Sequence, residues 1–338
     1  MNFPLVSVLM VTFNSARYVK AAIESVLAQT LGDFELIIAD DCSQDDTWGV
    51  IQKYSDDPRI RIHKHEQNLG EYPNRIWAAG KARGRYMIFI DGDDILYPHG
   101  LELLVTTLEA FPEAGLALSQ RWDERYIYPV QLDPKDVYRA HFLGRSVLSC
   151  VFPYILFRSV AYYAVGGLNP RIRTGDTYLC LLIAARYPCV LTWDGVAWWR
   201  ERYGQAFREW ADPASTVETL RYSLELLADK DCPLDSMERE MAVSNLCGTF
   251  LRKIFRRMMR GHIRESLKLL QAASLPKWLW HSLFIPSQWP YHPGSWPQRT
   301  ANTPDPPPPD WATMNAIRKR LFSANCTTYL NPLNDNKQ

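Results

Sequence analysis

Apolar residues in the N-terminal part of the chain alternate between two spacings. Continuous apolar runs rich in β-branched residues are typical of strands covered on both faces of a parallel sheet, and such runs lie at 6–11, 34–39, 60–63 and 86–90. Between them, apolar residues recur three and four positions apart, which marks one face of a helix, and the predicted helices span 19–27, 47–54 and 72–82. We expect Ser15 to cap the first helix, and Asp45 and Asp46 the second.

This alternation of strand and helix predicts an α/β fold with a doubly wound, mostly parallel sheet and right-handed crossovers. Ligands of such sheets bind beyond the carboxyl ends of the strands. The residues that follow the runs ending at Val11, Ala39 and Ile90 are therefore where we expect the chemistry.

The pattern weakens in the middle of the chain. We predict helices at 101–111, 159–165 and 177–187, and strands at 115–119, 152–157 and 188–192. Residues 121–145 are polar and aromatic without a clear period, and we interpret them as a loop-rich substrate region.

The C-terminal part has a different character. Helices are predicted at 217–229, 235–259 and 263–273, and nine prolines in 286–309 predict an extended tail. We therefore expect two halves of one α/β domain, a helical extension and a proline-rich tail, with bounds at 1–120, 121–212, 213–285 and 286–338.

Composition excludes several classes of protein. The 338 residues include 38 Lys and Arg against 37 Asp and Glu, which excludes the strong basic field of a nonspecific nucleic-acid-binding protein. We find neither a membrane-spanning apolar run nor a secretory signal, so the expected location is the cytoplasm. The seven cysteines are an odd number with no Cys-x-x-Cys pair, which indicates reduced thiols rather than disulfides or a zinc ribbon.

An acidic cluster follows the apolar run at 86–90. Asp91, Asp93 and Asp94 crowd three carboxylates at one strand end, and Gly92 lets the backbone turn between them. Two such charges 4 Å apart repel by about 4 kcal/mol at an effective dielectric constant of about 20. A hard divalent cation with a diphosphate would turn this repulsion into attraction, so the cluster predicts a metal site, although a solvated acidic turn is the alternative.

Polar residues also follow the first two predicted strands. Asp40 and Asp41 end the second, and a carboxylate there can accept a hydrogen bond from a nucleotide base. After the first strand, Thr12, Phe13 and Asn14 supply a hydroxyl, a ring for stacking and an amide. This combination suits a base and a ribose, although Phe13 could equally belong to the core.

Five segments resemble the inverting glycosyltransferases of family 2, which have the GT-A fold. They are VSVLMVTFN at 6–14, SVLAQT at 25–30, FELIIADDCSQDDT at 34–47, NLG at 68–70 and ARGRYMIFIDGDD at 82–94. The resemblance covers residues 1–120, in the family's order and at close to its usual spacing. It implies a nucleotide-sugar donor, commonly a UDP-sugar, bound with Mn²⁺ or Mg²⁺.

The resemblance also implies roles for individual residues. Asp41 would meet the base, and Thr12, Phe13 and Asn14 would line the nucleotide pocket. Asp91-Gly92-Asp93 would be the Asp-x-Asp motif that contacts nucleotide and metal, with Asp93 nearest the metal and Asp94 adjacent.

A weaker resemblance runs through 165–168, 175–179 and 198–205. Family members usually have an acidic pair at the second of these segments, where one carboxylate is the base that deprotonates the acceptor hydroxyl. Here only Asp176 is acidic, beside Gly175, so Asp176 is the expected base and a helix-capping role is the alternative. Arg200 and Gln205, with Arg202, would clamp the diphosphate.

Residues 251–260 form a basic amphipathic pattern. Their apolar stripe could lie on an anionic membrane or pack against the rest of the protein, and the sequence leaves both open.

We therefore expect a cytoplasmic, possibly membrane-associated enzyme that transfers a sugar from a nucleotide-diphosphate donor to a glycan or lipid-linked acceptor. The family-level setting is the biosynthesis of surface polysaccharide or lipopolysaccharide. The alternatives are a non-catalytic scaffold or binding subunit of a glycan-assembly complex and a sugar-phosphate nucleotidyltransferase. The latter would need a glycine-rich, basic loop that residues 12–15 do not provide.

Overall fold

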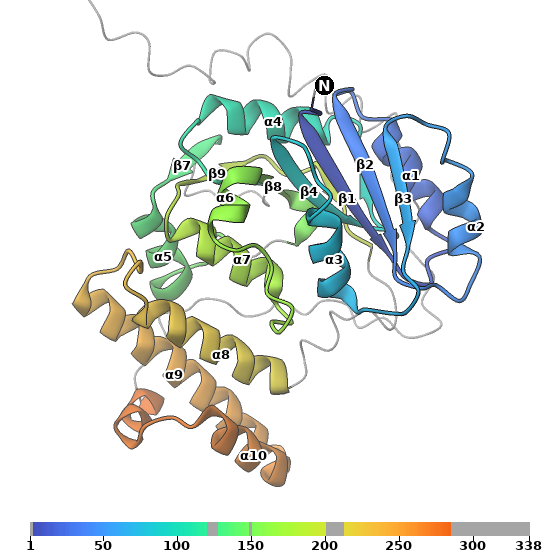
Figure 1. The fold of residues 1–338 in the computed structure, drawn as a ribbon. Coiled ribbons are helices and arrows are strands. Elements are labelled where there is room, and N and C mark those ends of the chain that lie inside the picture. The colour runs from blue at the N-terminus through green and yellow to red at the C-terminus, as the bar shows by residue number, and fades with distance from the viewer. Residues whose placement is uncertain (1–2, 120–127, 149–150, 201–212, 285–338) are drawn as a thin grey trace, which may run out of the picture.

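An eight-stranded sheet forms the centre of the protein, in the order β3-β2-β1-β4-β8-β6-β9-β7 (Figure 1). The computed structural model describes residues 3–119, 128–148, 151–200 and 213–284. The strands of this sheet are β1 (Val6–Thr12), β2 (Phe34–Asp40), β3 (Ile60–Lys64), β4 (Tyr86–Asp91), β6 (Leu116–Ser119), β7 (Val130–Leu132), β8 (Ile155–Arg158) and β9 (Cys189–Thr192).

The N-terminal half of the sheet is parallel, as predicted. In register, Val8 of β1 lies between Leu36 of β2 and Ile88 of β4, and all three side chains are buried. The C-terminal half is mixed, because β8 runs antiparallel to both β4 and β6, and β7 antiparallel to β9. The predicted mostly parallel α/β sheet is thus confirmed, with two reversed strands.

Helices cover both faces of the sheet, and two apolar cores result. One core contains Leu9 and Phe89 beneath helices α3, α5, α6 and α7, and the other contains Val8 and Ile88 beneath α1, α2 and α4. This division follows from the strand period of two, which sends neighbouring residues to opposite faces. The helices are α1 (Val19–Leu27), α2 (Thr47–Gln52), α3 (Glu71–Ala79), α4 (Gly100–Ala110), α5 (Pro134–Leu143), α6 (Ser159–Ala164) and α7 (Gly175–Ala184).

Two local predictions are wrong. The region 121–145 contains β7 and α5 where we expected loops, because Pro134 occupies the first turn of α5, where its missing N–H costs nothing. Ser15 does not cap α1. Tyr18 is the residue before that helix, and the Ser15 hydroxyl donates to the carbonyl of Phe13 instead.

Other expectations hold in modified form. Asp45 does accept the backbone N–H of Thr47 at the start of α2 (3.0 Å), and Asp46 precedes that helix without a side-chain cap. The predicted strand at 152–157 begins as a 3₁₀ turn, η1 (Phe152–Tyr154), before β8.

The C-terminal region is helical, as predicted, and consists of α8 (Pro213–Ala228), α9 (Ser236–Met259), α10 (Ile263–Ala273) and the 3₁₀ segment η3 (Lys277–Phe284). Asp235 and Glu238 form a reciprocal capping box at the start of α9. The proline-rich tail lies outside the described residues. Within the part of the chain that the structure describes, no helix is both long and apolar enough to cross a membrane.

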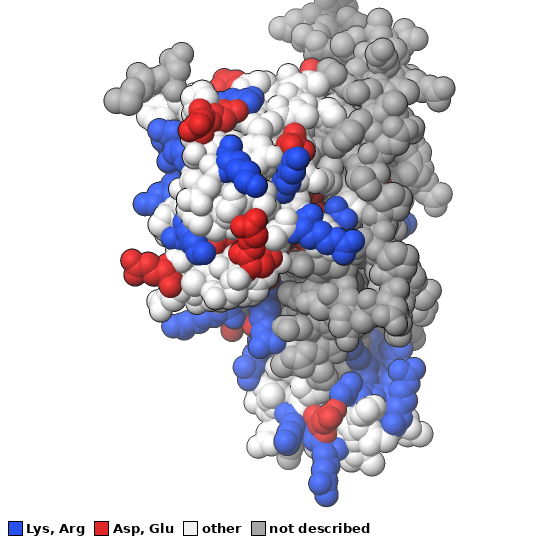
Figure 2. All heavy atoms as spheres, turned by 90° about the vertical axis from the view of Figure 1, so that its right-hand side faces the viewer, with Lys and Arg blue, Asp and Glu red and all other residues white. Residues whose placement is uncertain are grey.

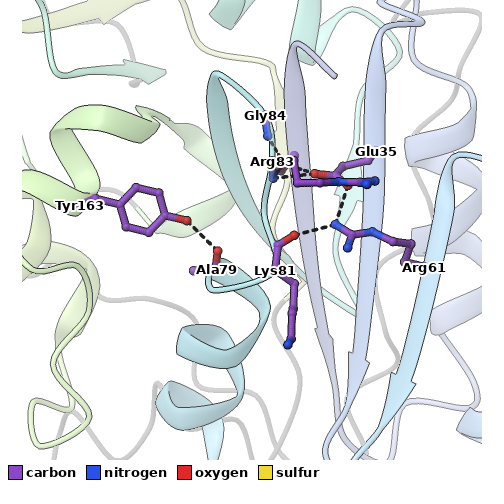
Figure 3. Close-up of polar contacts among 8 residues, drawn as sticks. Glu35, Arg61, Ala79, Lys81, Arg83, Gly84 and Tyr163 are labelled. Atoms are coloured by element: carbon purple, nitrogen blue, oxygen red, sulfur yellow. Dashed lines mark hydrogen bonds and ion pairs between the residues drawn. The ribbon is translucent and has the colours of Figure 1, made fainter. Parts of the chain in front are cut away.

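A buried carboxylate anchors the amino-terminal ends of the strands (Figure 3). Glu35 on β2 accepts hydrogen bonds from the Ser7 hydroxyl (2.6 Å), the backbone N–H of Arg83 (2.8 Å) and the guanidinium groups of Arg61 (2.5 Å) and Arg83 (3.0 Å). Burial raises the pKa of Glu35, but these bonds outweigh it and hold the pKa below its ordinary value. The hydrogen bonds of Glu35 join β2 to β1, to β3 and to the loop before β4. We therefore interpret this cluster as structural and look for the active site at the carboxyl ends of the strands.

The described cysteines are free thiols, namely Cys42, Cys180, Cys189, Cys232 and Cys247. Cys150 and Cys326 lie outside the described residues.

Candidate active site

The candidate site lies where β1, β2 and β4 end, beside the first turns of α3 and α7. Asp91 is the last residue of β4, and its carboxylate accepts a hydrogen bond from the guanidinium of Arg75 on α3 (2.5 Å). The same nitrogen of Arg75 also donates to Glu71, one turn earlier on α3 (3.1 Å). Helix α3 thus places a cation directly against the first aspartate of the predicted Asp-x-Asp motif.

Sequence reasoning missed Arg75, although it is the largest side chain that is almost completely buried. Its guanidinium lies over the Phe152 ring (4.6 Å to the centroid), and its Nε and Nη1 have no hydrogen-bond partner among the described residues. Burial lowers the pKa of Arg75, but the charges of Asp91 and Glu71 more than compensate and raise it. The sequence signal that could have found it is an arginine on a helix face whose other buried residues are Asn74, Ala78 and Ala79.

Asp94 is completely buried. One of its carboxylate oxygens accepts the backbone N–H of Arg200 (2.9 Å), and the other has no hydrogen-bond partner within the described chain. Burial, followed by the charges of Asp93 and Asp91, raises the pKa of Asp94 well above its ordinary value. Ionisation of Asp94 is therefore disfavoured in these surroundings.

Arg200, a predicted diphosphate ligand, lies against this cluster. Its guanidinium is stacked between Tyr18 (4.5 Å) and Trp198 (4.4 Å), and its Nε donates to the carbonyl of Asp93 (2.8 Å). The short strands β5 (Ile95–Leu96) and β10 (Ala197–Trp198) pair and bring this segment to the end of β4. Arg202 and Gln205 lie outside the described residues.

The predicted base-binding residues do meet at the ends of β1 and β2. Both carboxylate oxygens of Asp41 accept backbone N–H groups, from Leu69 (2.7 Å) and Gly70 (2.9 Å), so Asp41 orders the 68–70 loop. The Thr12 hydroxyl donates to Asp40 (3.0 Å) and lies buried within this cluster.

Phe13 and Asn14 are more open. The Phe13 side chain is 45% exposed at this edge, so it is not a core residue. Asn14 has a φ of +48°, and its amide oxygen accepts the backbone N–H of Gln44 (2.9 Å). The exposed ring of Phe13 therefore borders a loop that is fixed by hydrogen bonds.

Asp176 lies in the first turn of α7 and is buried. Burial raises its pKa to about 6, although the backbone N–H of Thr177 donates to the carboxylate (2.7 Å). Glu71 raises the pKa further, and Arg75 lowers it. Arg75 thus donates a hydrogen bond to Asp91 and also lowers the pKa of Asp176. The sequence did not reveal this link, because Asp91 and Asp176 lie far apart along the chain.

Tyr72 on α3 holds the start of α7. Its hydroxyl donates to the carbonyl of Arg173 (2.7 Å) and accepts the backbone N–H of Gly175 (2.9 Å). A Cβ at Gly175 would lie 2.3 Å from the Tyr72 ring. The tyrosine ring therefore occupies the space of any side chain at position 175, which gives a physical reason for glycine where the resemblance led us to expect a second acidic residue.

The carboxylates at the end of β4 only partly match the metal site that we predicted. No three Asp, Glu, His or Cys side chains among the described residues are grouped so that they could hold a metal ion. However, one buried oxygen of Asp94 has no hydrogen-bond partner among the described residues, and a cation beside it would favour the ionised form of this carboxyl. Magnesium-type ions are commonly held by one or two carboxylates together with substrate phosphates, so the cluster fits a cation that arrives with a diphosphate.

Comparison with known proteins gives a consistent result. The family profile described as "Glycosyl transferase family 2" matches residues 7–166. An uncharacterized glycosyltransferase of Haemophilus influenzae is 25% identical over 189 residues, which are 54% of this chain and 63% of that protein. The putative teichuronic acid biosynthesis glycosyltransferase TuaG of Bacillus subtilis is 41% identical over 92 residues, 27% of this chain and 36% of that protein. The chain thus spans less than two thirds of the length of these relatives.

Solved structures share the fold. The structure of S. aureus TarS 1–349 in complex with UDP-GlcNAc superposes with a TM-score of 0.60 at 17% identity, covering 81% of this chain and 82% of that one. Mannosyltransferase PcManGT from Pyrobaculum calidifontis, in complex with GDP-Man and Mn²⁺, gives a TM-score of 0.51 at 15% identity over 98% and 84% of the two chains. The mixed α/β architecture is thus that of the GT-A glycosyltransferases.

Proposed function

Because residues 7–166 belong to glycosyl transferase family 2, we propose that the protein is an inverting glycosyltransferase that uses a nucleotide-diphosphate sugar and a divalent metal. The observation that carries this proposal is the pair of carboxylates joined through α3. Asp91 accepts a bond from Arg75, and Arg75 and Glu71 both influence the pKa of Asp176. The reaction needs a carboxylate at the donor, here Asp91 of the Asp-x-Asp motif. It also needs a second carboxylate that can act as the base, here Asp176.

Asp176 is the general base of the proposed reaction. The acceptor hydroxyl gives its proton to the Asp176 carboxylate as its oxygen forms a bond to the anomeric carbon of the sugar. The bond from that carbon to the diphosphate breaks, and the nucleoside diphosphate leaves with the electron pair. A base whose pKa is about 6 is largely ionised at neutral pH and is still basic enough to take a proton in the transition state.

Of Asp91, Asp93 and Asp94, one or two carboxylates would hold Mn²⁺ or Mg²⁺ together with the diphosphate of the donor. The ion would neutralise the negative charge that develops on the departing diphosphate. The Nε of Arg200 donates to the Asp93 carbonyl and its backbone N–H donates to the Asp94 carboxylate, so Arg200 keeps the turn in place. We keep Arg200 and Gln205 as candidate diphosphate ligands.

The nucleotide would lie over the ends of β1 and β2. The exposed Phe13 ring offers a stacking surface, and Asp41, Thr12 and Asn14 form the polar floor beside it. The relatives support a UDP-sugar and a surface glycan. TarS was solved with UDP-GlcNAc, and a 41% identical relative in Escherichia coli is named UDP-Glc:alpha-D-GlcNAc-diphosphoundecaprenol beta-1,3-glucosyltransferase WfaP. We therefore propose a glycan or lipid-linked acceptor in surface polysaccharide synthesis.

The proposal is tested by donor hydrolysis and sugar transfer with UDP-, GDP- and dTDP-sugars, each with Mn²⁺ and with a chelator. We expect turnover with a UDP-sugar that requires the metal and is lost in Asp93→Asn. The absence of turnover with every donor would instead favour the non-catalytic scaffold.

Asp176→Asn tests the assignment of the base. We expect it to bind the donor as the wild type does and to lose about 10²- to 10⁴-fold in transfer rate, the usual contribution of a general base. Asp56→Asn is the matched control, because Asp56 is exposed and lies in the turn before β3, at the end of the strand opposite to the site. Equal transfer rates for Asp176→Asn and the control would contradict the role of Asp176.

A further inference from the structure

The turn between α9 and α10 carries large apolar side chains that the structure leaves exposed. Gly261, with a φ of +90°, reverses the chain between the two helices. We call residues 252–268 the hairpin tip. At 1.5 Å rise per residue, its exposed apolar residues lie within about 9 Å of Gly261 along the helix axes. They are Phe255 (54% exposed), Met259 (74%), Ile263 (55%) and Leu267 (54%).

The core of the helical region does not account for these four side chains. Leu251 and Ile254 of α9 are buried in it with Val217 and Leu220 of α8, and α10 contributes Leu269 and Leu270. The apolar stripe predicted at 251–260 is thus divided. Leu251 and Ile254 stabilise the helical region, while Phe255 and Met259 remain outside it.

The hairpin tip is also strongly basic. It contains seven Lys and Arg residues and one acidic residue, Glu265, although the whole chain has a net charge of only +1. Glu265 pairs with Arg257. Arg260, Arg264 and Lys268 form no ion pair with any residue that the structure describes. Figure 2 shows Lys and Arg side chains projecting around an uncharged surface at the lower end of the molecule.

We propose that the hairpin tip binds the surface of a bilayer that contains anionic lipid. Exposed aliphatic and aromatic side chains next to arginines are the combination that partitions into the interface of such a membrane. The charges are attracted to the lipid headgroups, and the apolar side chains are removed from water. A bilayer surrounds a projecting turn on all sides, so it can accommodate apolar groups on both helices of the tip.

The position of the tip fits this partner. In Figure 1, the arrows of β1 to β4 point toward the side of the molecule from which α8, α9 and α10 extend. The candidate active site at the strand ends and the hairpin tip therefore lie on the same side. Membrane binding does not depend on the proposed function, but if that function is correct, binding would bring the site toward a lipid-linked acceptor.

The test is sedimentation of the full chain with vesicles of phosphatidylcholine alone or mixed with phosphatidylglycerol. We expect binding at least about tenfold tighter to the mixed vesicles, and weaker binding as salt is added. Arg260→Gln with Arg264→Gln and Lys268→Gln should lower the affinity about a hundredfold, since each basic residue near an anionic surface contributes a factor of about five.

A second variant tests the apolar contribution. Met259→Ser with Ile263→Ser and Leu267→Ser should reduce binding to the mixed vesicles at least about tenfold. Val160→Ser with Met237→Ser is the matched control, because both residues are 69% exposed but lie outside the tip. Circular dichroism checks that every variant is folded, and hydrolysis of a soluble donor reports the proposed activity separately.

Three results would overturn the proposal. They are equal binding to both kinds of vesicle, no binding to either, and tip variants that bind as the wild type does. Self-association without vesicles that the serine variant abolishes would also overturn it, because the tip would then be a contact between copies of the chain.

Discussion

Asp176 and Gly175 are neighbours in the chain, but the structure constrains them for different reasons. Asp176 matters for its charge, because burial keeps its pKa near 6. Gly175 matters for its lack of a side chain, because the Tyr72 ring fills the adjoining space. At this scale the consequences can be measured one residue at a time.

The pH dependence of transfer should report Asp176. A base acts only when ionised, so kcat should fall as pH drops through about 6 and level off above it. The charged side chains that shift the pKa of Asp176 are Glu71 and Arg75, and Asp176 in turn raises the pKa of the neighbouring Tyr72 and Tyr222. Glu71→Gln removes a negative charge and should move the midpoint to lower pH. The expected midpoint of the wild-type profile is at a pH of about 6, so a kcat that does not change between pH 5 and pH 8 would contradict this prediction.

Gly175→Ala should destabilise the protein. The added methyl group would lie 2.3 Å from the Tyr72 ring, and overpacking of this kind costs about 1–3 kcal/mol. Urea unfolding measures the loss. Gly32→Ala is the control, because a Cβ there meets nothing within 4 Å. In a Tyr72→Ala background, Gly175→Ala should cause little further loss in the free energy of unfolding. If the two losses add in full, the clash with the Tyr72 ring is not the cause.

At the scale of elements, α3 has the central position. Glu71, Tyr72 and Arg75 all lie on it. Arg75 contacts Asp91 at the end of β4, Tyr72 contacts the start of α7, and Glu71 pairs with Arg75. At the other end of the sheet, Glu35 joins β2 to β1, to β3 and to the loop before β4. The strands are therefore joined at their amino ends by a carboxylate with several hydrogen-bond partners, while at the carboxyl ends Arg75 and Asp94 keep buried polar atoms without a partner among the described residues.

Glu35→Gln should lower the free energy of unfolding by about 2 kcal/mol at neutral pH, since it leaves arginines without their carboxylate. Because Arg61 and Arg83 are partly exposed, solvent screening makes the loss smaller than for a fully buried pair.

The wild type provides the sign of the pH effect. The folded pKa of Glu35 lies below its ordinary value of 4.5, so the stabilisation is complete above pH 4.5 and is lost as pH falls through the folded pKa. The stability difference between wild type and Glu35→Gln should therefore shrink in acid. Glu24→Gln, at an exposed pair with Lys20, serves as control, and a difference that grows in acid would contradict the assignment.

At the scale of the whole molecule, the helical region shares its core with the sheet domain. Tyr222, Leu226 and Leu227 of α8 pack in the same apolar cluster as Phe157 and Leu181. Ion pairs from Lys135 and Arg139 on α5 to Glu238 on α9 cross the same boundary. We therefore expect the helical region and the sheet domain to unfold together.

Leu227→Ala should consequently destabilise the whole protein rather than the helical region alone. Deleting a buried leucine side chain costs about 2–5 kcal/mol, and Leu227 is buried in the shared core. Far- and near-ultraviolet circular dichroism should show one coincident transition at a lower temperature. Leu267→Ala, at an exposed position of α10, should leave that transition in place, and two separate transitions in Leu227→Ala would exclude a shared core.

The sequence by itself determined the strands β1 to β4, the alternation with helices and the clustering of aspartates at strand ends. These follow from local patterns, since the spacing of apolar residues decides which faces can be buried. It was wrong at β7 and α5, where pairing of an edge strand with β9 supplies what the local pattern lacks. Only the tertiary structure brought Arg75 between Asp91 and Glu71, placed Tyr72 against Gly175 and left Phe255 and Met259 outside the core. Those outcomes depend on which residues distant in the chain come into contact, and contact between distant residues leaves no period in the sequence.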